Sequence, residues 1–386
     1  MKPGRWWRDC RMFRPERLAV RTDYLKEAGA MIDDVYIEGA ALEFSWADPK
    51  RSLTELIFCT VTKAVEDAGG SYDGIDSVVL AAHDLVDGRS LSSMVTAPAA
   101  GAYLRDEVRY SDDGAGAFVA AVARIEAGEA ERSIVAAWGR ASEHDVEELS
   151  RALFDRILLA PLGLEELHIS ALNAQKWRIN GGDCSQVAAA QARREAAARS
   201  NPRALHKGGR RSAPAYPLTA EHLPLWADVV AAVVISKRPS SVKVMGMGLS
   251  SEPYWFGDRG VAKAPALRRA AESALAEAQI GIDAIDLFEM DGMTLYDEAI
   301  ALEAIGLAQP GEGMRVLAQD KRCNPSGGSM AGYGAPAMGL ARIVEAALQL
   351  RGTAGAVQQG KPRTALASGL SVTAAQTQTV VVLEAV

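Results

Sequence analysis

An uncharged, glycine-rich run over residues 324–339 is the feature that most constrains the fold of this chain. It reads Asn-Pro-Ser-Gly-Gly-Ser-Met-Ala-Gly-Tyr-Gly-Ala-Pro-Ala-Met-Gly and leads into apolar residues at helical spacing from Leu340 to Leu348, which predict an amphipathic helix. So many glycines beside a helix start allow the backbone to approach another segment or a ligand closely. The run lacks the Gly-Lys-Ser/Thr ending of a phosphate-binding loop, which argues against a nucleotide-hydrolase site of that kind.

Bulk properties describe a globular chain of 386 residues, 48% hydrophobic and 24% charged, that can form one large or two ordinary domains. The net charge of −7 argues against nucleic acid as the main partner. We expect no membrane segment, because no apolar run approaches transmembrane length. Residues 1–33, rich in Arg and Trp, are expected to form an N-terminal extension. The widely spaced cysteines favour a reducing cytoplasm over a disulfide framework or a zinc site: Cys10, Cys59, Cys184 and Cys323.

Strand-like and helix-like stretches alternate along the body, which is typical of an α/β fold. Residues 64–80 and 267–289 share one order: an Ala-rich helix, a short turn with glycine and a strand that begins Ile-Asp. Chance likeness between two αβ units is the alternative, but a duplication predicts two similar halves packed face to face. The predicted regions are 34–144 with 221–240 for the first half, 145–220 for a loop insertion and 241–386 for the second half.

Two strand-to-helix junctions carry candidate chemistry. The first is Ser111-Asp112-Asp113-Gly114, at a helix N-terminus that favours negative charge. In the simplest interpretation Asp112 or Asp113 caps this helix. The Ser111 hydroxyl is too weak an acid to ionise in that field alone, so it would need an adjacent base to act as a nucleophile.

The second junction covers residues 289–298 and contains Asp291, which either caps the following helix or acts as a general base. Tyr296 lies one turn further on. Tyr333 is the one titratable side chain of the glycine-rich run, and it is either a proton-transfer group or an exposed structural tyrosine. The chain has no histidine after residue 222.

Over residues 34–386 these segments resemble the thiolases, in particular their sterol-carrier branch. The most specific match is Asn324–Gly328 together with the helix that follows it. The resemblance implies a duplicated αβαβα layered fold with two similar halves and a long inserted loop region. It also implies that Ser111 stands where the family has its Cys-x-x-Gly nucleophile, that the family histidine near Tyr333 is missing, and that Ala367 replaces a second cysteine.

The same resemblance suggests roles for the remaining positions. Tyr333 and Asp291 are the candidates for proton transfer, and the backbone N–H groups near Gly114 and Gly369 would form an oxyanion hole. Substrate binding is expected at Asn324, Gly327 and Gly328. Arg210 belongs to a basic cluster that either meets the phosphates of coenzyme A or is solvated loop surface.

Ordinary thiolysis requires an acyl-enzyme on the cysteine that this chain lacks. The resemblance therefore implies retro-aldol carbon–carbon cleavage of a β-hydroxyacyl-CoA, in the degradation of a steroid, aromatic or branched acyl chain. Coenzyme A enters as the thioester substrate, and no covalently bound cofactor is expected. The alternatives are a non-catalytic acyl-CoA-binding or scaffold subunit and an atypical acyltransferase that uses Ser111. Expected partners are a second copy of the chain and a small protein with an OB-fold and a zinc ribbon.

Overall fold

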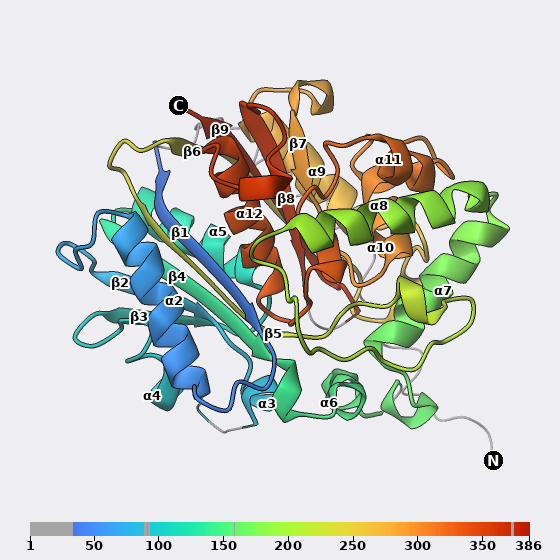
Figure 1. Ribbon diagram of the computed structural model, residues 1–386, viewed down its shortest axis with the longest axis horizontal. Coiled ribbons are helices and arrows are strands. Elements are labelled where there is room, and N and C mark those ends of the chain that lie inside the picture. Colours follow the sequence, from blue (N-terminus) through green and yellow to red (C-terminus); the bar gives the residue numbers. More distant parts are fainter. Residues whose placement is uncertain (1–33, 89–90, 92, 158, 372–373) are drawn as a thin grey trace, which may run out of the picture.

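The strands of both predicted halves join into one mixed nine-stranded sheet, in the order β3-β2-β4-β5-β1-β6-β9-β8-β7 (Figure 1). The computed structural model describes residues 34–88, 91, 93–157, 159–371 and 374–386, so the predicted extension over residues 1–33 lies outside the described residues. The strands are β1 (Tyr36–Ser45), β2 (Ser77–Ala81), β3 (Asp106–Tyr110), β4 (Arg132–Arg140), β5 (Asp228–Ser236), β6 (Val242–Ser251), β7 (Leu287–Glu289), β8 (Thr364–Leu370) and β9 (Thr377–Ala385).

The two halves of the sheet have the same strand pattern. In the first half β2 and β4 are parallel, and β5 and β1 follow as antiparallel neighbours. In the second half β7 and β8 are parallel, and β9 and β6 follow in the same way. The halves meet where the start of β1 pairs with the start of β6, and β3 is an additional edge strand of the first half. This repetition confirms the predicted fold of two similar halves, but the sheets of the halves join edge to edge through β1 and β6 and are not packed face to face as expected.

One packing detail is also repeated. The pairing of β1 is irregular at Gly39, and the pairing of β6 is irregular at Gly246. A Cβ at Gly39 would overlap the carbonyl oxygen of Ala64, and a Cβ at Gly246 would overlap that of Ala274. Both alanines belong to the Ala-rich helices of the predicted repeat, so each half brings a helix onto its sheet through the same close contact.

The helices complete a layered α/β arrangement. The outer helix α2 packs on β1 and β5, and its counterpart α9 packs on β6 and β9. Between the halves lie α5 and α12, which contact each other and strands of both halves (Figure 1). Ser52 and Glu55 start α2 with a capping box. These helices are α2 (Leu53–Asp67), α5 (Gly114–Glu126), α9 (Pro265–Glu277) and α12 (Met338–Leu350).

Residues 145–220, expected as a loop insertion, contain three helices joined by long connections: α6 (Val146–Leu153), α7 (Glu166–Ile179) and α8 (Val187–Ser200). Helix α7 packs on α10 (Leu295–Ala304), and α8 packs on α11 (Gly313–Gln319). The sequence pattern missed α8 because its buried face includes Gln191 and Arg194 beside small alanines, so it has no apolar stripe. The short helices are α3 (Asp84–Asp87) and α4 (Ser93–Thr96).

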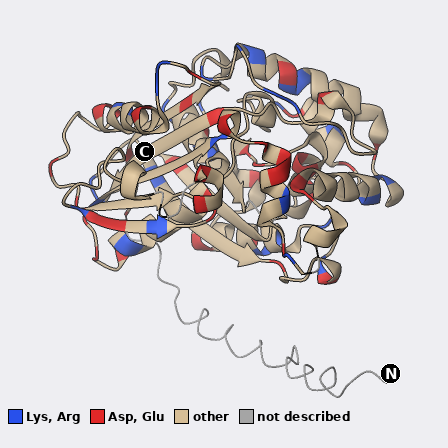
Figure 2. Cartoon of the chain, turned by 90° about the horizontal axis from the view of Figure 1, so that it is seen from below, with Lys and Arg blue, Asp and Glu red and all other residues tan. Residues whose placement is uncertain are grey.

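Acidic and basic residues are interspersed along the elements seen in Figure 2. Many of them form ion pairs, such as Arg203 with Glu345 at 2.5 Å. Within the described residues, no helix combines the length and the apolar character that crossing a bilayer requires.

Candidate active site

Asp291 lies on the loop between β7 and α10. Thr294 caps α10, with Asp297 completing a capping box, so Asp291 is not the helix cap that the sequence left open. Its backbone N–H donates to Ser368 Oγ at 3.0 Å, and its side chain is buried. Burial raises the pKa of the Asp291 carboxyl to about 7, although Arg342 and the N–H of Leu370 favour the ionised form. A carboxyl with this pKa can accept a proton near neutral pH.

Tyr333 is held by its backbone on both sides. Its N–H donates to Leu225 O at 2.8 Å, its carbonyl accepts from Ala227 N at 2.9 Å, and its ring meets Trp226 edge-on at 5.3 Å. Tyr333 is only 4% exposed, so it is not the exposed tyrosine of the alternative interpretation. Burial, followed by the negative charge of Asp291, raises the pKa of Tyr333 well above 10. Its hydroxyl therefore keeps its proton at neutral pH and can donate a hydrogen bond.

Asp291 and Tyr333 line the same cavity of about 100 Å³, which we call the first cavity. Two further carboxyl groups, those of Glu166 and Asp297, also face it. Most of the remaining wall is apolar, with Trp226 next to Tyr333. The wall is completed by Ile169, Ser170, Asn173, Ala264, Leu267, Met293, Ile300, Ala301, Ala335, Leu370, Ser371, Ala374, Ala375 and Gln378. The structure thus brings together two predicted proton-transfer residues that lie more than forty positions apart in the chain.

Glu166 is a site residue that the sequence did not reveal. It is the first residue of α7, its backbone N–H donates to Ser150 Oγ at 2.8 Å, and its carboxylate accepts from Ala374 N. Burial, together with Asp297 and Asp112, raises the pKa of Glu166 to about 8, while Arg259 opposes the shift. An acidic residue in the first turn of a helix is common, so nothing in the sequence marked it.

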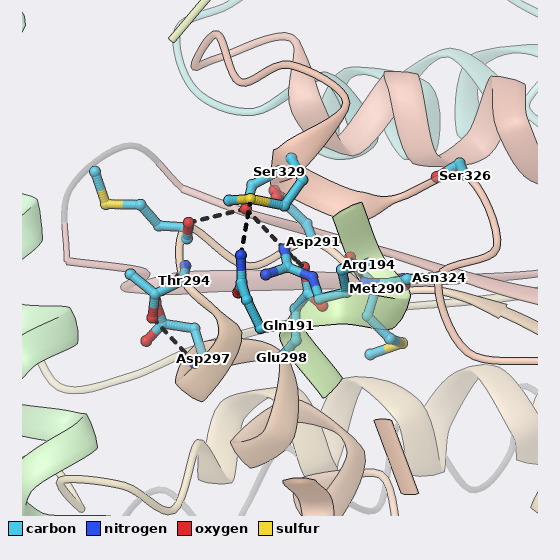
Figure 3. A network of polar contacts seen from close by, with 12 residues as sticks. Gln191, Arg194, Met290, Asp291, Thr294, Asp297, Glu298, Asn324, Ser326 and Ser329 are labelled. Carbon is cyan, nitrogen blue, oxygen red and sulfur yellow. Dashed lines mark hydrogen bonds and ion pairs between the residues drawn. The ribbon is translucent and has the colours of Figure 1, made fainter. Parts of the chain in front are cut away.

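A buried polar network fixes the loop that carries Asp291 (Figure 3). Asn324 accepts from Met290 N at 2.6 Å and donates to Met290 O at 3.1 Å, which ties the residue before Asp291 to the glycine-rich run. Arg194 pairs with Glu298 at 2.5 Å, and both side chains are fully buried. Asn324 was expected to bind substrate, but its side chain is used for this internal clamp.

Gly327 and Gly328 were also expected at the substrate, and the structure places them in packing contacts. Gly327 has φ +98°, and a Cβ there would collide with the backbone of Ala198 on α8. A Cβ at Gly328 would collide with Glu298 of the buried ion pair. The close approach predicted from these glycines is therefore made to the protein itself.

The helix N-terminus next to Ser111 is already occupied. Ser111 is exposed and is not among the residues that line the first cavity. Asp113 is the cap of α5: its Oδ2 accepts from Ala115 N at 2.8 Å, and its Oδ1 accepts from Gly339 N at 3.0 Å near the start of α12. The Gly114 N–H donates to Pro336 O at 3.0 Å, so the oxyanion role expected for Gly114 is wrong.

Two further predicted residues lie outside the cavity wall. The ring of Tyr296 packs edge-on against Trp177 and His222, at 5.7 Å and 5.5 Å between ring centres. Arg210 forms an ion pair with Glu147, and its backbone pairs with that of Trp226. Tyr296 thus serves packing, and the charge of Arg210 is already balanced within the protein. Among the described residues, no group of His, Cys, Asp and Glu side chains is arranged to hold a metal ion.

Comparisons with known proteins agree with this architecture. Residues 256–385 match the family described as thiolase C-terminal domain-like. Three solved structures each align with 92% of this chain. The Ltp2-ChsH2(DUF35) aldolase has 18% sequence identity and a TM-score of 0.76, and the alignment covers 99% of that chain. A monomeric SCP2-thiolase like protein type 1 from Mycobacterium smegmatis has 18% identity, 78% coverage and a TM-score of 0.65, and human mitochondrial 3-ketoacyl-CoA thiolase in complex with CoA has 16% identity, 99% coverage and a TM-score of 0.66.

The chain has a thiolase-like fold. The resemblance stated from the sequence is confirmed at this level. No curated protein matches the chain by sequence.

The Asp113 carboxyl lies two positions after Ser111, the predicted nucleophile position, and is buried. A Cβ at Gly369 would overlap Asp113 Oδ2, so the Asp113 carboxyl fills the space between the start of α5 and Gly369. Burial and the nearby Asp291 raise the pKa of Asp113 well above its usual value. The Asp113 carboxyl is therefore buried beside the start of α5, whereas the Ser111 hydroxyl belongs to an exposed residue.

Proposed function

We propose that the protein cleaves a carbon–carbon bond of a β-hydroxyacyl-CoA thioester by a retro-aldol reaction. The observation that supports this proposal is the shared cavity of Asp291, Tyr333 and Glu166, combined with the Asp113 carboxyl that caps α5 near the predicted nucleophile position. Among the described residues, no cysteine lines the cavity, and burial raises the pKa of the buried thiol of Cys323 to about 12. A covalent thioester intermediate is therefore not part of the proposed mechanism.

The reaction needs a base, a hydrogen-bond donor and an acid. The Asp291 carboxylate removes the proton of the β-hydroxyl group, while the Tyr333 hydroxyl donates a hydrogen bond to the same oxygen. As the carbonyl forms on the β-carbon, the bond between the α- and β-carbons breaks and its electron pair becomes the enolate of the thioester. Glu166, protonated at neutral pH, then protonates the α-carbon. Proton exchange from Asp291 back to Glu166 restores both groups.

The products are an aldehyde or ketone and a shortened acyl-CoA, with no external oxidant or reductant. Steroid, aromatic and branched acyl chains are the proposed substrate sources, as expected from the resemblance. One of the aligned structures is the Ltp2-ChsH2(DUF35) aldolase, and another is the human thiolase in complex with CoA. These names support an aldolase reaction, a CoA thioester and a second protein as partner, here a small OB-fold and zinc-ribbon protein.

We also propose a homodimer formed through the edge of the first half. Strand β3 is the outermost strand there, and several large apolar side chains near it are exposed, among them Met94, Tyr103 and Leu104. The proposed location is the cytoplasm, because Cys59, Cys184 and Cys323 are free thiols.

The test is to incubate the purified protein, alone and with co-expressed partner, with 3-hydroxyacyl-CoA esters and to follow both products by mass spectrometry. Replacing Tyr333 by Phe removes one donor to the reacting oxygen and is expected to lower kcat about 100-fold while the protein stays folded. Ser111→Ala is the matched control and should retain activity. Thioester binding without turnover would instead favour the non-catalytic subunit, and acyl transfer that depends on Ser111 would favour the acyltransferase.

A further inference from the structure

A second cavity, of about 50 Å³, adjoins the first. The two cavities share three wall residues, Glu166, Trp226 and Ala335, which form a partition between them. Helix α6 contributes Val146, Leu149, Ser150 and Leu153 to the wall of the second cavity. Its lining is mainly apolar on this side, with Val86, Val146, Leu149 and Leu153.

The end of the second cavity at Arg140 and His144 is polar and incompletely paired. Arg140 Nε and His144 Nε2 are buried, and within the described part of the chain neither has a hydrogen-bond partner. Arg140 Nη1 pairs with Glu143 at 2.9 Å, but its Nε lies 4.0 Å from Asp228 Oδ2, beyond hydrogen-bond distance. Burial lowers the pKa of His144, so its ring is neutral at pH 7. Buried groups of this kind are normally paired, so an occupant with an oxygen at this end would complete the site.

We propose that the second cavity binds the substituent on the β-carbon of the substrate, the part that leaves as an aldehyde or ketone. This inference rests on the proposed retro-aldol function and specifies its substrate class. The β-carbon stays beside Asp291 and Tyr333 in the first cavity, and its substituent extends into the second cavity past the side chains of Glu166, Trp226 and Ala335, which line both.

The size and lining of the second cavity define the substituent. A cavity of about 150 Å³ accommodates benzene, so one of about 50 Å³ takes roughly two to four non-hydrogen atoms. Its body is apolar, to match Leu149 and Leu153, and its end carries an oxygen for His144 and Arg140. Of the steroid, aromatic and branched acyl chains proposed above, the second cavity therefore selects branched ones with a short oxygen-bearing β-substituent, because a steroid or an aromatic ring on the β-carbon is too large for it.

Three CoA esters separate size from polarity. In 3-hydroxybutanoyl-CoA the β-substituent is a single methyl group. In 3-hydroxy-5-methylhexanoyl-CoA and 3,5-dihydroxyhexanoyl-CoA the substituents have the same shape and differ by a methyl group in place of a hydroxyl. A hydrogen bond between the second hydroxyl group of the dihydroxy ester and the neutral ring of His144 is expected to make kcat/KM of the wild type about 10-fold higher for this ester than for its methyl isostere.

Two variants then test the cavity itself. Leu149→Trp fills it from α6 and is expected to lower kcat/KM about 100-fold for both larger esters, and less than about threefold for 3-hydroxybutanoyl-CoA. His144→Leu should abolish the preference for the dihydroxy ester. The control is Leu172→Trp, on an exposed part of α7, which should behave as the wild type. Thermal denaturation checks that each variant is folded.

Binding is read separately from chemistry by titrating the three esters onto Asp291→Asn protein with and without the cavity substitutions. If the wild type cleaves none of the esters, the proposed function fails. The cavity assignment is still supported if the dihydroxy ester binds more tightly than its methyl isostere and if Leu149→Trp weakens the binding of both larger esters. The assignment is overturned if Leu149→Trp affects all three esters equally or not at all, or if His144→Leu leaves the preference for the dihydroxy ester unchanged.

Discussion

The two halves of the molecule share a strand pattern but use their polar groups differently. In the first half, the carboxyl at the start of the central helix α5 is directed inward. Asp113 accepts from Ala115 N of its own helix and from Gly339 N at the equivalent position of α12, the second residue of each helix. In the second half, Asp291 and Tyr333 face a cavity.

This difference shows how a duplicated framework can change its chemistry. A helix N-terminus stabilises negative charge and is the place where a thiolate would be favoured. Here one carboxyl joins the N-termini of both central helices, so that position stabilises the contact between the halves. The groups left to handle protons are Asp291 and Tyr333 of the second half and Glu166 of the inserted helices.

The comparison between Asp291 and Asp113 predicts the largest effect. Asp291→Asn removes the base but keeps the size of the side chain, so kcat/KM for a β-hydroxyacyl-CoA should fall by about 10² to 10⁴. Its free energy of unfolding should change little, because the Asn side-chain oxygen can still accept from the backbone N–H of Leu370 and the bond from Asp291 N–H to Ser368 is a backbone bond. Steady-state kinetics and urea denaturation of the same preparation check both statements. A fully active Asp291→Asn protein would place the base elsewhere.

The second prediction concerns the stability of the junction between the halves. Asp113→Ala leaves the N–H groups of Ala115 and Gly339 buried without their acceptor, which is expected to lower the free energy of unfolding by about 3 kcal/mol. Asp113→Asn keeps one oxygen acceptor and should lose about half as much. Urea denaturation followed by tryptophan fluorescence measures the difference. Equal stability of all three proteins would show that Asp113 does not join the helices.

The third prediction tests whether the repeated strand–helix contact is equivalent in both halves. Gly39→Ala and Gly246→Ala each place a methyl group against a helix carbonyl, of Ala64 and Ala274 respectively. Overpacking of this kind is expected to lower the stability by about 2 kcal/mol at either position. Gly70→Ala is the control that separates packing from backbone strain. Gly70 is exposed, an added Cβ would contact no other atom there, and its φ of +80° strains any residue other than glycine. A loss at one of the two paired positions alone would contradict the equivalence.

The sequence predicted the framework well because similar residue types recur at the positions where each half packs a helix on its sheet. Ala64 and Ala274, with their turns and Ile-Asp strands, mark the two halves, and the glycine-rich run marks the segment pressed between them. Asp291 and Tyr333 could be proposed because each lies at a recognisable junction. The close approach of their chain segments follows from the sheet order, which the resemblance implied.

The parts that were missed depend on contacts between distant segments. The prediction at Ser111 depends on a strand-to-helix boundary that sequence does not locate to within two residues, and α5 begins at Gly114 with Asp113 as its cap. Gly327 and Gly328 were assigned to substrate because sequence shows that a close approach occurs, not what is approached, here α8 and Glu298. Glu166 was missed because only the fold of the insertion places the start of α7 against Tyr333 and Ala374.

The smallest expected effect is a pH dependence that separates the base from the acid. The pKa of Asp291, about 7, predicts that kcat/KM rises as the pH increases through 7, because the carboxylate form is required. The pKa of Glu166, about 8, predicts a fall above 8, because the protonated form is required. Tyr333 does not contribute in this range, since its pKa lies well above 10.

Glu166→Gln isolates the second limb of this profile. The charged and titratable groups around Glu166 are Asp297, Asp112 and Arg259, with Tyr333 on one side of the partition and Arg140 and His144 on the other. From pH 8 to pH 9 the wild type should lose about fivefold in kcat/KM, since about half of the acid form remains at the pKa and about a tenth remains one pH unit above it. The Gln variant should start lower and stay flat over this interval, while it keeps the rise near pH 7. If the variant shows the same fall above pH 8, another group is the acid, and Glu166 only separates the two cavities.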